Sequence, residues 1–242
     1  MNIIQNSSAT AVVVLTCLMG GCDNNRVQTQ RDEELAPYFL PHNARLQEDD
    51  LRRATTIIFV MDDGETGSEE NRNDDSDMSQ LAKMPSLRRL TIACSQVTSQ
   101  GFGALKDSQL EALIATKTNI GDDAVLQLAN SKALKLLMLG ETHVTNNSVE
   151  FIAEHFPALE KLELSETSVD DKAVPFLATL QHLAELDLSN ANVTDASVPA
   201  LSKMTQLKTL NVSCVPSDET SISSDGAKRL RGALPNTDVI HW

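Results

Sequence analysis

A leucine pattern that recurs every 23 to 25 residues constrains this chain more than any other feature. The motif L-x-x-L-x-L, or a close variant, begins at six leucines spaced 23, 24, 25, 24 and 24 residues apart: Leu87, Leu110, Leu134, Leu159, Leu183 and Leu207. A unit this short cannot bury its own apolar residues, so neighbouring units must stack to close a shared core. The pattern therefore predicts a solenoid.

Each unit opens with a short strand. In the unit that begins at Leu159, Leu162 and Leu164 alternate with Glu163. Successive side chains of a strand point to opposite faces, so we expect the two leucines to face the core and the glutamate to face outward.

A helical segment follows each strand after a turn that reads V-T-D or similar. In one such turn we expect Asp195 to accept backbone N–H bonds at the start of its own segment, residues 196–204. Val198, Leu201 and Met204 then lie three residues apart, which places them on one apolar helical face.

These motifs resemble the leucine-rich-repeat family, especially the subtype with T-x-V-T-D after the strand that is familiar from ribonuclease-inhibitor-like and F-box-associated repeats. The resemblance covers residues 87–214. A weaker unit precedes it and fills its strand and helix positions with Ile57, Phe59, Met78, Leu81 and Met84. The resemblance implies an α/β fold: a right-handed solenoid with seven to eight parallel strands on the concave face and helices on the convex face.

Both ends of the repeat domain, residues 51–242, are expected to be modified. An acidic insertion at 62–77 splits the first unit, and a C-terminal cap at 215–242 extends the last one. The final residues VIHW should form a last strand with Trp242 as a lid, because a terminal repeat must cover its outer face. Residues 22–50 are polar and are expected to form a tether and an N-terminal cap.

The N-terminus indicates targeting to a membrane or export. Residues 1–21 are expected to be a signal peptide, since 9–21 form an apolar run that is too short to span a bilayer and ends in small residues. Residues 19–22, Met-Gly-Gly-Cys, resemble a bacterial lipobox, which implies lipidation of Cys22. Met19 and the lack of Lys or Arg in the first ten residues depart from that pattern, and an ordinary secretory signal is the alternative.

Composition and motifs argue against several functions. The net charge of −14 disfavours nucleic acid and anionic lipid surfaces as partners, so membrane contact is expected only through a lipid anchor. The acidic insertion lacks EF-hand spacing, and the five histidines lack metal-ligand spacing. Catalytic motifs are also missing. We therefore expect a non-enzymatic protein with neither cofactor nor metal.

The two cysteines of the repeat domain are not expected to form a disulfide. Cys94 and Cys214 occupy the same position in the first and last well-formed repeats. Five repeats at about 4.8 Å per strand separate them by roughly 24 Å, which is too far for a bond.

The outward strand positions are the remaining candidate site. Ile114, Leu136 and Met138 should form an exposed apolar cluster, with Glu163 and Asp187 on its C-terminal side. The expected partner-binding residues are Arg89, Ile114, Leu136, Met138, Lys161, Glu163, Glu185, Asp187 and Asn211. Packing of the cluster under a loop or against a second copy remains an alternative.

These observations favour a protein or peptide ligand bound to a monomer at the bacterial cell envelope. A structural spacer of the envelope is the second interpretation. An F-box adaptor is disfavoured, because the residues before the repeats resemble a signal and tether rather than F-box helices.

Overall fold

The computed structural model of the chain describes residues 38–40, 55–59, 73–214 and 221–242. Its centre is a single nine-stranded parallel sheet in which the strands follow one another in chain order, where the sequence predicted seven to eight strands. The strands are β1 (Tyr38–Leu40), β2 (Thr56–Phe59), β3 (Arg89–Thr91), β4 (Ala112–Ile114), β5 (Leu136–Met138), β6 (Lys161–Glu163), β7 (Glu185–Asp187), β8 (Thr209–Asn211) and β9 (Asp238–Ile240).

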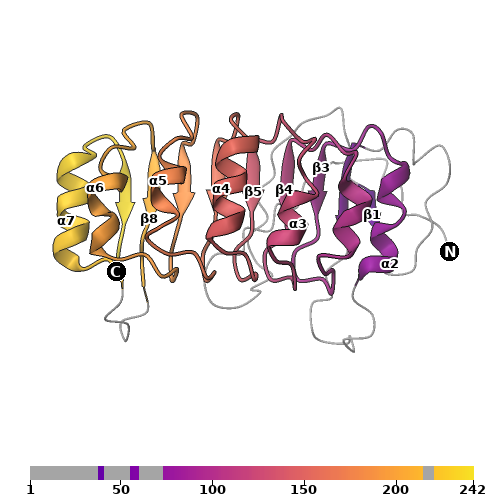
Figure 1. Ribbon diagram of the computed structural model, residues 1–242, viewed down its shortest axis with the longest axis horizontal. Coiled ribbons are helices and arrows are strands. Elements are labelled where there is room, and N and C mark those ends of the chain that lie inside the picture. Colours follow the sequence, from indigo (N-terminus) through magenta and orange to yellow (C-terminus); the bar gives the residue numbers. More distant parts are fainter. Residues whose placement is uncertain (1–37, 41–54, 60–72, 215–220) are drawn as a thin grey trace, which may run out of the picture.

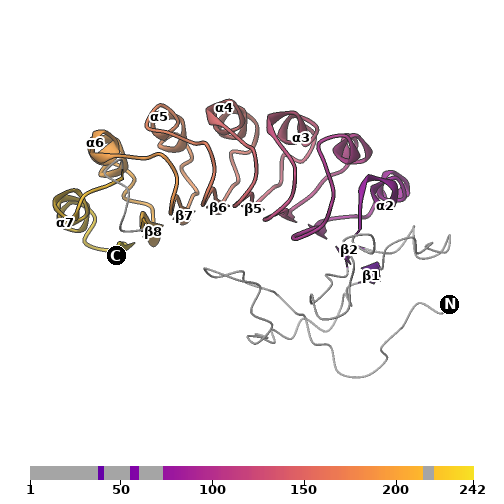
Figure 2. The same cartoon turned by 90° about the horizontal axis from the view of Figure 1, so that it is seen from below.

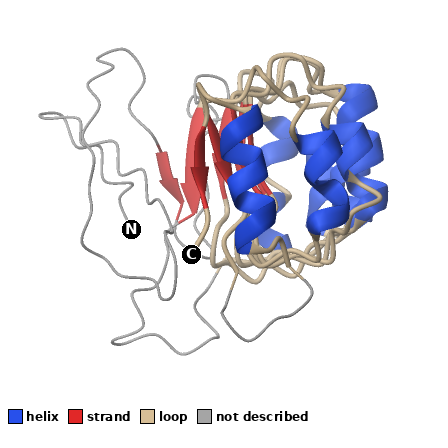
Figure 3. Ribbon diagram, turned by 90° about the vertical axis from the view of Figure 1, so that its left-hand side faces the viewer, coloured by secondary structure: helices blue, strands red, loops and turns tan. Residues whose placement is uncertain are grey.

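In the part of the chain that the structure describes, helical segments cover one face of this sheet and none lies on the other, as the side views show (Figures 2 and 3). Most of them are single turns, since a repeat of this length leaves little room for more. They are α2 (Asp75–Met78), η2 (Leu81–Lys83), η3 (Gly101–Leu105), α3 (Asp122–Leu126), α4 (Asn146–His155), α5 (Val174–Leu177), η4 (Asp195–Ser197), α6 (Val198–Leu201) and α7 (Ser224–Ala233). The repeated units form an arc with the strands on its inner side (Figures 1 and 2).

The core lies between the two layers and is built from columns of aliphatic side chains. The strand register aligns one inward residue from each of the strands β2 to β9, each at most 5% exposed: Ile57, Leu90, Leu113, Leu137, Leu162, Leu186, Leu210 and Val239. Leu164, which directly follows β6, is also fully buried, and together with Leu162 it confirms the predicted inward orientation of the two leucines. Val198 and Leu201 are buried on one face of α6, as expected, and Met204 is buried as well but lies beyond the end of this helix.

The C-terminal end is covered differently from the prediction. The last residues do form a strand, β9, but Trp242 is 61% exposed and therefore is not a lid. The buried residues at this end include Ala227 and Leu230 of α7. The prediction failed because a residue at the chain end has no periodic position to fix where its side chain points.

A left-handed residue ends the strand segment in five successive repeats. Their φ angles lie between 53° and 59°, and the residues are Cys94, Lys117, Glu141, Glu166 and Asn190. Each donates its backbone N–H to a carbonyl of the next repeat, at 2.8 to 3.0 Å. Residues other than glycine and asparagine rarely adopt this conformation, which costs about 1–2 kcal/mol per residue. The backbone bonds between repeats therefore impose the same turn on very different residues.

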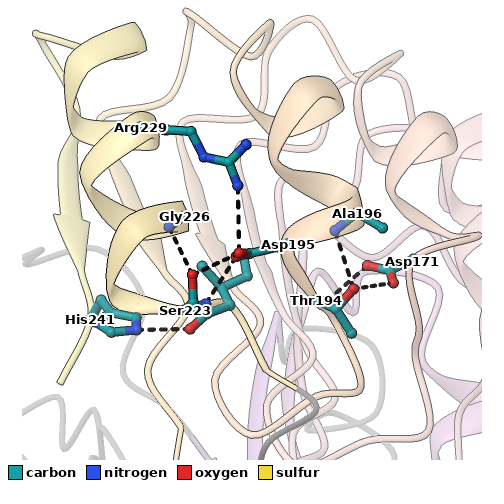
Figure 4. A network of polar contacts seen from close by, with 9 residues as sticks. Asp171, Thr194, Asp195, Ala196, Ser223, Gly226, Arg229 and His241 are labelled. Carbon is teal, nitrogen blue, oxygen red and sulfur yellow. Dashed lines mark hydrogen bonds and ion pairs between the residues drawn. The ribbon is translucent and has the colours of Figure 1, made fainter.

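An acidic side chain joins neighbouring repeats on the helical side of four turns. Its carboxylate accepts a backbone N–H at 2.8 to 2.9 Å and a hydroxyl at 2.6 to 2.7 Å from one residue of the next repeat. The pairs are Asp75 with Thr98, Asp122 with Thr145, Asp171 with Thr194, and Asp195 with Ser223. We call each pair an interrepeat clasp; two of them are visible in Figure 4.

The clasps correct the expected role of Asp195. The residue that caps the following helical segment is Thr194, whose hydroxyl accepts the backbone N–H of Ala196. The carboxylate of Asp195 instead reaches Ser223 in the next unit, and Arg229 lies 3.5 Å from it (Figure 4). Sequence periodicity places Asp195 at the turn correctly but does not tell whether its partner lies in the same repeat or in the next.

Each clasp also restricts the residue three positions after its hydroxyl partner. A Cβ atom at Gly101 would lie 2.4 Å from Oδ1 of Asp75, and one at Gly226 would lie 2.0 Å from Oδ1 of Asp195. In the other two clasps this position is Ser148 or Ser197, whose hydroxyl donates a further hydrogen bond to the carboxylate. Glycine and serine are thus the residues that occupy this position in the four clasps.

Replacing Asp122 tests the strength of a clasp. We expect Asp122→Ala to lower the free energy of unfolding by about 2–3 kcal/mol, because it removes several hydrogen bonds to a charged group. The neighbouring Asp123 is exposed, and Asp123→Ala should cost less than about 0.5 kcal/mol. Urea unfolding monitored by circular dichroism compares the two variants.

The same clasp predicts a pH dependence. Burial alone would raise the pKa of Asp122, but hydrogen bonds from Ser148 and Thr145 outweigh it and hold the pKa below its usual 3.8. The stabilisation is therefore complete above pH 3.8 and is lost as the pH falls through the folded-state value. The clasp would be contradicted if both substitutions lowered the free energy of unfolding equally. It would also be contradicted if the difference in this free energy between wild type and Asp122→Ala stayed constant as the pH falls below 3.8.

Candidate functional site

The concave face of the sheet carries the predicted partner-binding residues in two aligned rows. The register places Arg89, Leu136, Lys161 and Glu185 in one row and Ile114, Met138, Glu163, Asp187 and Asn211 in the next. Arg89 and Glu185 are exposed, whereas Ile114, Leu136, Met138, Lys161 and Asp187 are half-buried. Glu163 and Asn211 are only 7% and 8% exposed.

The apolar cluster is continuous across two strands. Ile114 pairs with Met138 in the register, and Ala112 beside it pairs with Leu136. All four side chains are partly open to solvent, although the residues on either side of them in the strands, such as Leu113 and Leu137, are fully buried. The structure therefore brings the three predicted apolar residues together on the open face of the sheet.

Lys161 and Glu185 form an ion pair across neighbouring strands. Their charged atoms are 2.8 Å apart and both side chains remain partly exposed. A second pair, Lys117 with Glu141, lies at the turns that follow β4 and β5, at 3.2 Å. Exposed pairs of this kind contribute up to about 1 kcal/mol. They also leave little net charge where they lie.

Glu163 was expected to face outward into solvent, and the structure corrects this. Its side chain lies on the concave side but is covered, and its carboxylate accepts hydroxyl bonds from Ser165 at 2.6 Å and from Thr116 at 3.0 Å. Thr116 follows β4, two strands away. The reach is possible because the intervening strand, β5, is followed by Gly140.

Gly140 supplies the space that Glu163 occupies. A Cβ atom at this position would lie 2.2 Å from Oε1 of Glu163 and 2.5 Å from the hydroxyl of Ser165. Any larger residue would force the glutamate to move. The glycine is thus required by the position of the glutamate next to it.

Asp187 is the neighbour of Glu163 in the same row. Its Oδ1 accepts the hydroxyl and backbone N–H of Ser189 at 2.6 and 2.8 Å, and its Oδ2 accepts the amide of Asn211 at 2.9 Å. These bonds fix the side chain on the sheet. They are all to neutral groups, so they leave the negative charge of the carboxylate in place.

Sequence reasoning missed, as part of the site, the polar residues that follow the strands on the concave side. Thr116, Ser165 and Ser189 lie just beyond the strands and hold the two carboxylates. The available signal was a serine two residues after each acidic strand residue, in E-L-S and D-L-S. Such a spacing places the hydroxyl on the same face as the carboxylate.

The described ranges contain few other groups that suggest chemistry. In these ranges no three His, Cys, Asp or Glu residues come close enough together to hold a metal ion. Cys94 and Cys214 are not joined by a disulfide, as expected. Among the helices of the described part, none is long and apolar enough to cross a bilayer. Cys22, like the rest of the expected signal peptide and tether up to residue 37, lies outside the described residues.

Comparison with known proteins identifies the fold. No family model matches the chain, and a search of curated proteins found no match. A solved structure of an internalin from Listeria monocytogenes matches with a TM-score of 0.52 and 22% sequence identity, over 66% of this chain and 43% of the internalin chain. The chain thus corresponds to less than half of that protein. The likeness supports an α/β solenoid with an open parallel sheet, of the leucine-rich-repeat type.

The burial of Glu163 predicts how stability changes with pH. Burial raises the pKa of Glu163 above its usual 4.5; the charge of Asp187 adds to the rise, while hydrogen bonds from Ser165 and Thr116 oppose it. Ionisation of this group therefore opposes folding as the pH rises above 4.5. The variant Glu163→Gln lacks this penalty and keeps an acceptor oxygen.

We expect the stability of wild type relative to Glu163→Gln to fall as the pH is raised from about 4.5 to 7.5, by about 1.4 kcal/mol for every pH unit by which the folded-state pKa exceeds 4.5. Chemical denaturation at several pH values measures the difference. Glu160→Gln, at an exposed position three residues away, serves as the control and should show no such trend. If the free energy of unfolding of wild type instead rose with pH relative to that of Glu163→Gln, the glutamate would not be buried.

Proposed function

We propose that this chain is a non-enzymatic repeat protein that binds another protein or a peptide through the concave face of its sheet. The observation that supports the proposal is the cluster of Ile114, Leu136 and Met138. These side chains are partly exposed in the middle of a sheet face on which the described residues form no helical layer, and acidic residues adjoin them. Apolar patches with a polar border are typical of protein interaction sites.

The shape of the surface favours an extended macromolecular ligand over a metabolite. The apolar cluster and the adjoining acidic residues span β4 to β7, four strands at about 4.8 Å spacing, or roughly 14 Å from first to last. Small-molecule sites are usually concave pockets that enclose their ligand. A sheet face on the inner side of an arc (Figure 2) instead suits a chain segment or a protein surface.

We further propose that the protein acts at the bacterial cell envelope, held by a lipid on Cys22 or released by secretion. Support comes from the sequence of the first 22 residues alone, where an apolar run ends in Gly-Gly-Cys. In this arrangement the repeat domain functions as a monomer on a polar tether. The alternative, a spacer that separates envelope components, needs no ligand on the concave face.

A pair of matched substitutions tests the binding surface. Leu136→Ser together with Met138→Ser removes apolar contact area, and a loss of even ~80 Å² would weaken binding by roughly 2 kcal/mol, close to thirtyfold. Leu126→Ser makes the same chemical change at a side chain that is 46% exposed on α3, in the opposite layer, and should leave binding unchanged.

The measurement begins with affinity capture from envelope extract by the wild-type protein, followed by surface plasmon resonance of the captured partner against each variant. Circular dichroism checks that the variants are folded. The concave face would be ruled out as the site if the Leu136→Ser, Met138→Ser double variant bound the partner with wild-type affinity, or if this variant and Leu126→Ser lost affinity equally.

Mass spectrometry of the natively expressed protein tests the location. If Cys22 is lipidated, the mature N-terminus is Cys22 carrying two or three acyl chains, and residues 1–21 are absent. A chain that retains Met1, or one that begins at an unmodified Cys22, would contradict lipid anchoring. Recovery of an unlipidated mature chain from the medium would favour the secreted form.

A further inference from the structure

The outward positions of the sheet divide into an apolar half and an acidic half. From β2 to β5 they include Ile58, Ala112, Ile114, Leu136 and Met138, with Arg89 as the one charged residue on these strands. From β6 to β9 they carry four carboxylates and one cation: Glu163, Glu185, Asp187, Asp238 and Lys161. The boundary between the halves runs between β5 and β6.

Strands β6 and β7 carry two pairs of charged register partners on the concave face. One pair has opposite charges and the other has like charges. In the first row, Lys161 faces Glu185 and the two form an ion pair. In the adjacent row, Glu163 faces Asp187, so that two acidic residues are direct register partners. Like charges placed directly opposite each other destabilise a sheet. Stability alone would favour a neutral or a cationic residue at one of the two positions.

The hydrogen bonds of this acidic pair do not neutralise it. Glu163 and Asp187 accept bonds from hydroxyl, amide and backbone N–H groups, and neither has an ion pair with a Lys or Arg of the described ranges. Burial and the neighbouring charge raise the pKa of Glu163. A cation placed beside the pair would oppose that rise by favouring the ionised form of Glu163, and in this partly desolvated position it would be attracted to the carboxylates more strongly than at an open surface.

The acidic pair lies within reach of a ligand seated on the apolar cluster. Met138 in β5 and Asp187 in β7 are two strands apart, or about 10 Å, and an extended peptide presents side chains to the same face about every 7 Å. A ligand residue two or four positions beyond an apolar anchor therefore meets the acidic pair if its side chain is long.

We propose that the concave face recognises an extended segment of a partner protein in which an apolar side chain contacts Ile114, Leu136 and Met138, and a lysine or arginine two or four residues away contacts Asp187 beside Glu163. This inference rests on the proposed function and specifies the chemistry of its ligand. The cation compensates the acidic pair, and the apolar anchor contributes contact area.

Selection from a random library tests the chemistry before any partner is identified. Random 12-residue peptides displayed on phage are selected on the full chain in low salt, and the enriched peptides are synthesised. We expect them to contain an apolar residue with Lys or Arg two or four positions from it. Replacing that basic residue with norleucine should weaken binding by about tenfold.

Variants of the protein assign the contacts. Asp187→Asn should weaken binding of the selected peptides by about tenfold and flatten its salt dependence, whereas Met138→Ser should weaken binding and leave the salt dependence unchanged. Glu150→Gln removes the same charge from an exposed residue of α4, in the helical layer, and should change neither property.

The outcomes separate this inference from the function it rests on. Peptides that lose affinity with Met138→Ser but are neutral or acidic, and that bind Asp187→Asn as well as wild type, would overturn the basic ligand and leave the concave binding surface standing. If no enriched peptide is sensitive to Met138→Ser, or if no peptide is enriched, both proposals fail.

Discussion

Each repeat of this protein depends on its neighbours to bury its apolar side chains. The inward column that runs from Ile57 to Val239 is closed only because each strand is bonded to the next at a fixed register. The same register sets the outward rows, so the binding face follows from the packing of the core. The interrepeat clasps add a second set of hydrogen bonds between neighbouring repeats, on the helical side. A carboxylate such as Asp171 that reaches Thr194 joins two units through polar contacts where the apolar core ends.

Periodicity in the sequence predicted the features that recur in each repeat, but it missed the side-chain contacts between different repeats. The alternation at Leu162, Glu163 and Leu164 gave the inward and outward faces correctly, because a strand has only two faces. It did not predict that Glu163 would be covered, since this depends on the empty space at Gly140 in the preceding unit. Asp195 shows the same limit, because its partner Ser223 lies 28 residues ahead. A glycine just beyond a strand can signal such a close approach, but the pattern of one repeat does not show which residue approaches.

The concave face combines two features that stability alone would not select. Ile114, Leu136 and Met138 leave apolar surface in water, and the adjacent strands place Glu163 against Asp187. The interrepeat clasps, in contrast, pair each of their carboxylates with a hydroxyl and a backbone N–H. Local departures of this kind from the rules of stable folding are typical of functional sites. The likeness to an internalin supports the solenoid, and the chemistry of the face must be argued from the residues of this chain.

The hydrogen bond between Thr116 and Glu163 has a mechanical consequence for the whole arc. The clasps and the backbone bonds join only adjacent units, so bending strain in the stack passes from one unit to the next. This bond spans 47 residues and ties β4 to β6 across the repeat between them. Three consecutive units therefore resist a change of curvature together. A change of curvature in this segment would have to break the bond, which therefore favours a preset curvature in its middle that a ligand need not impose.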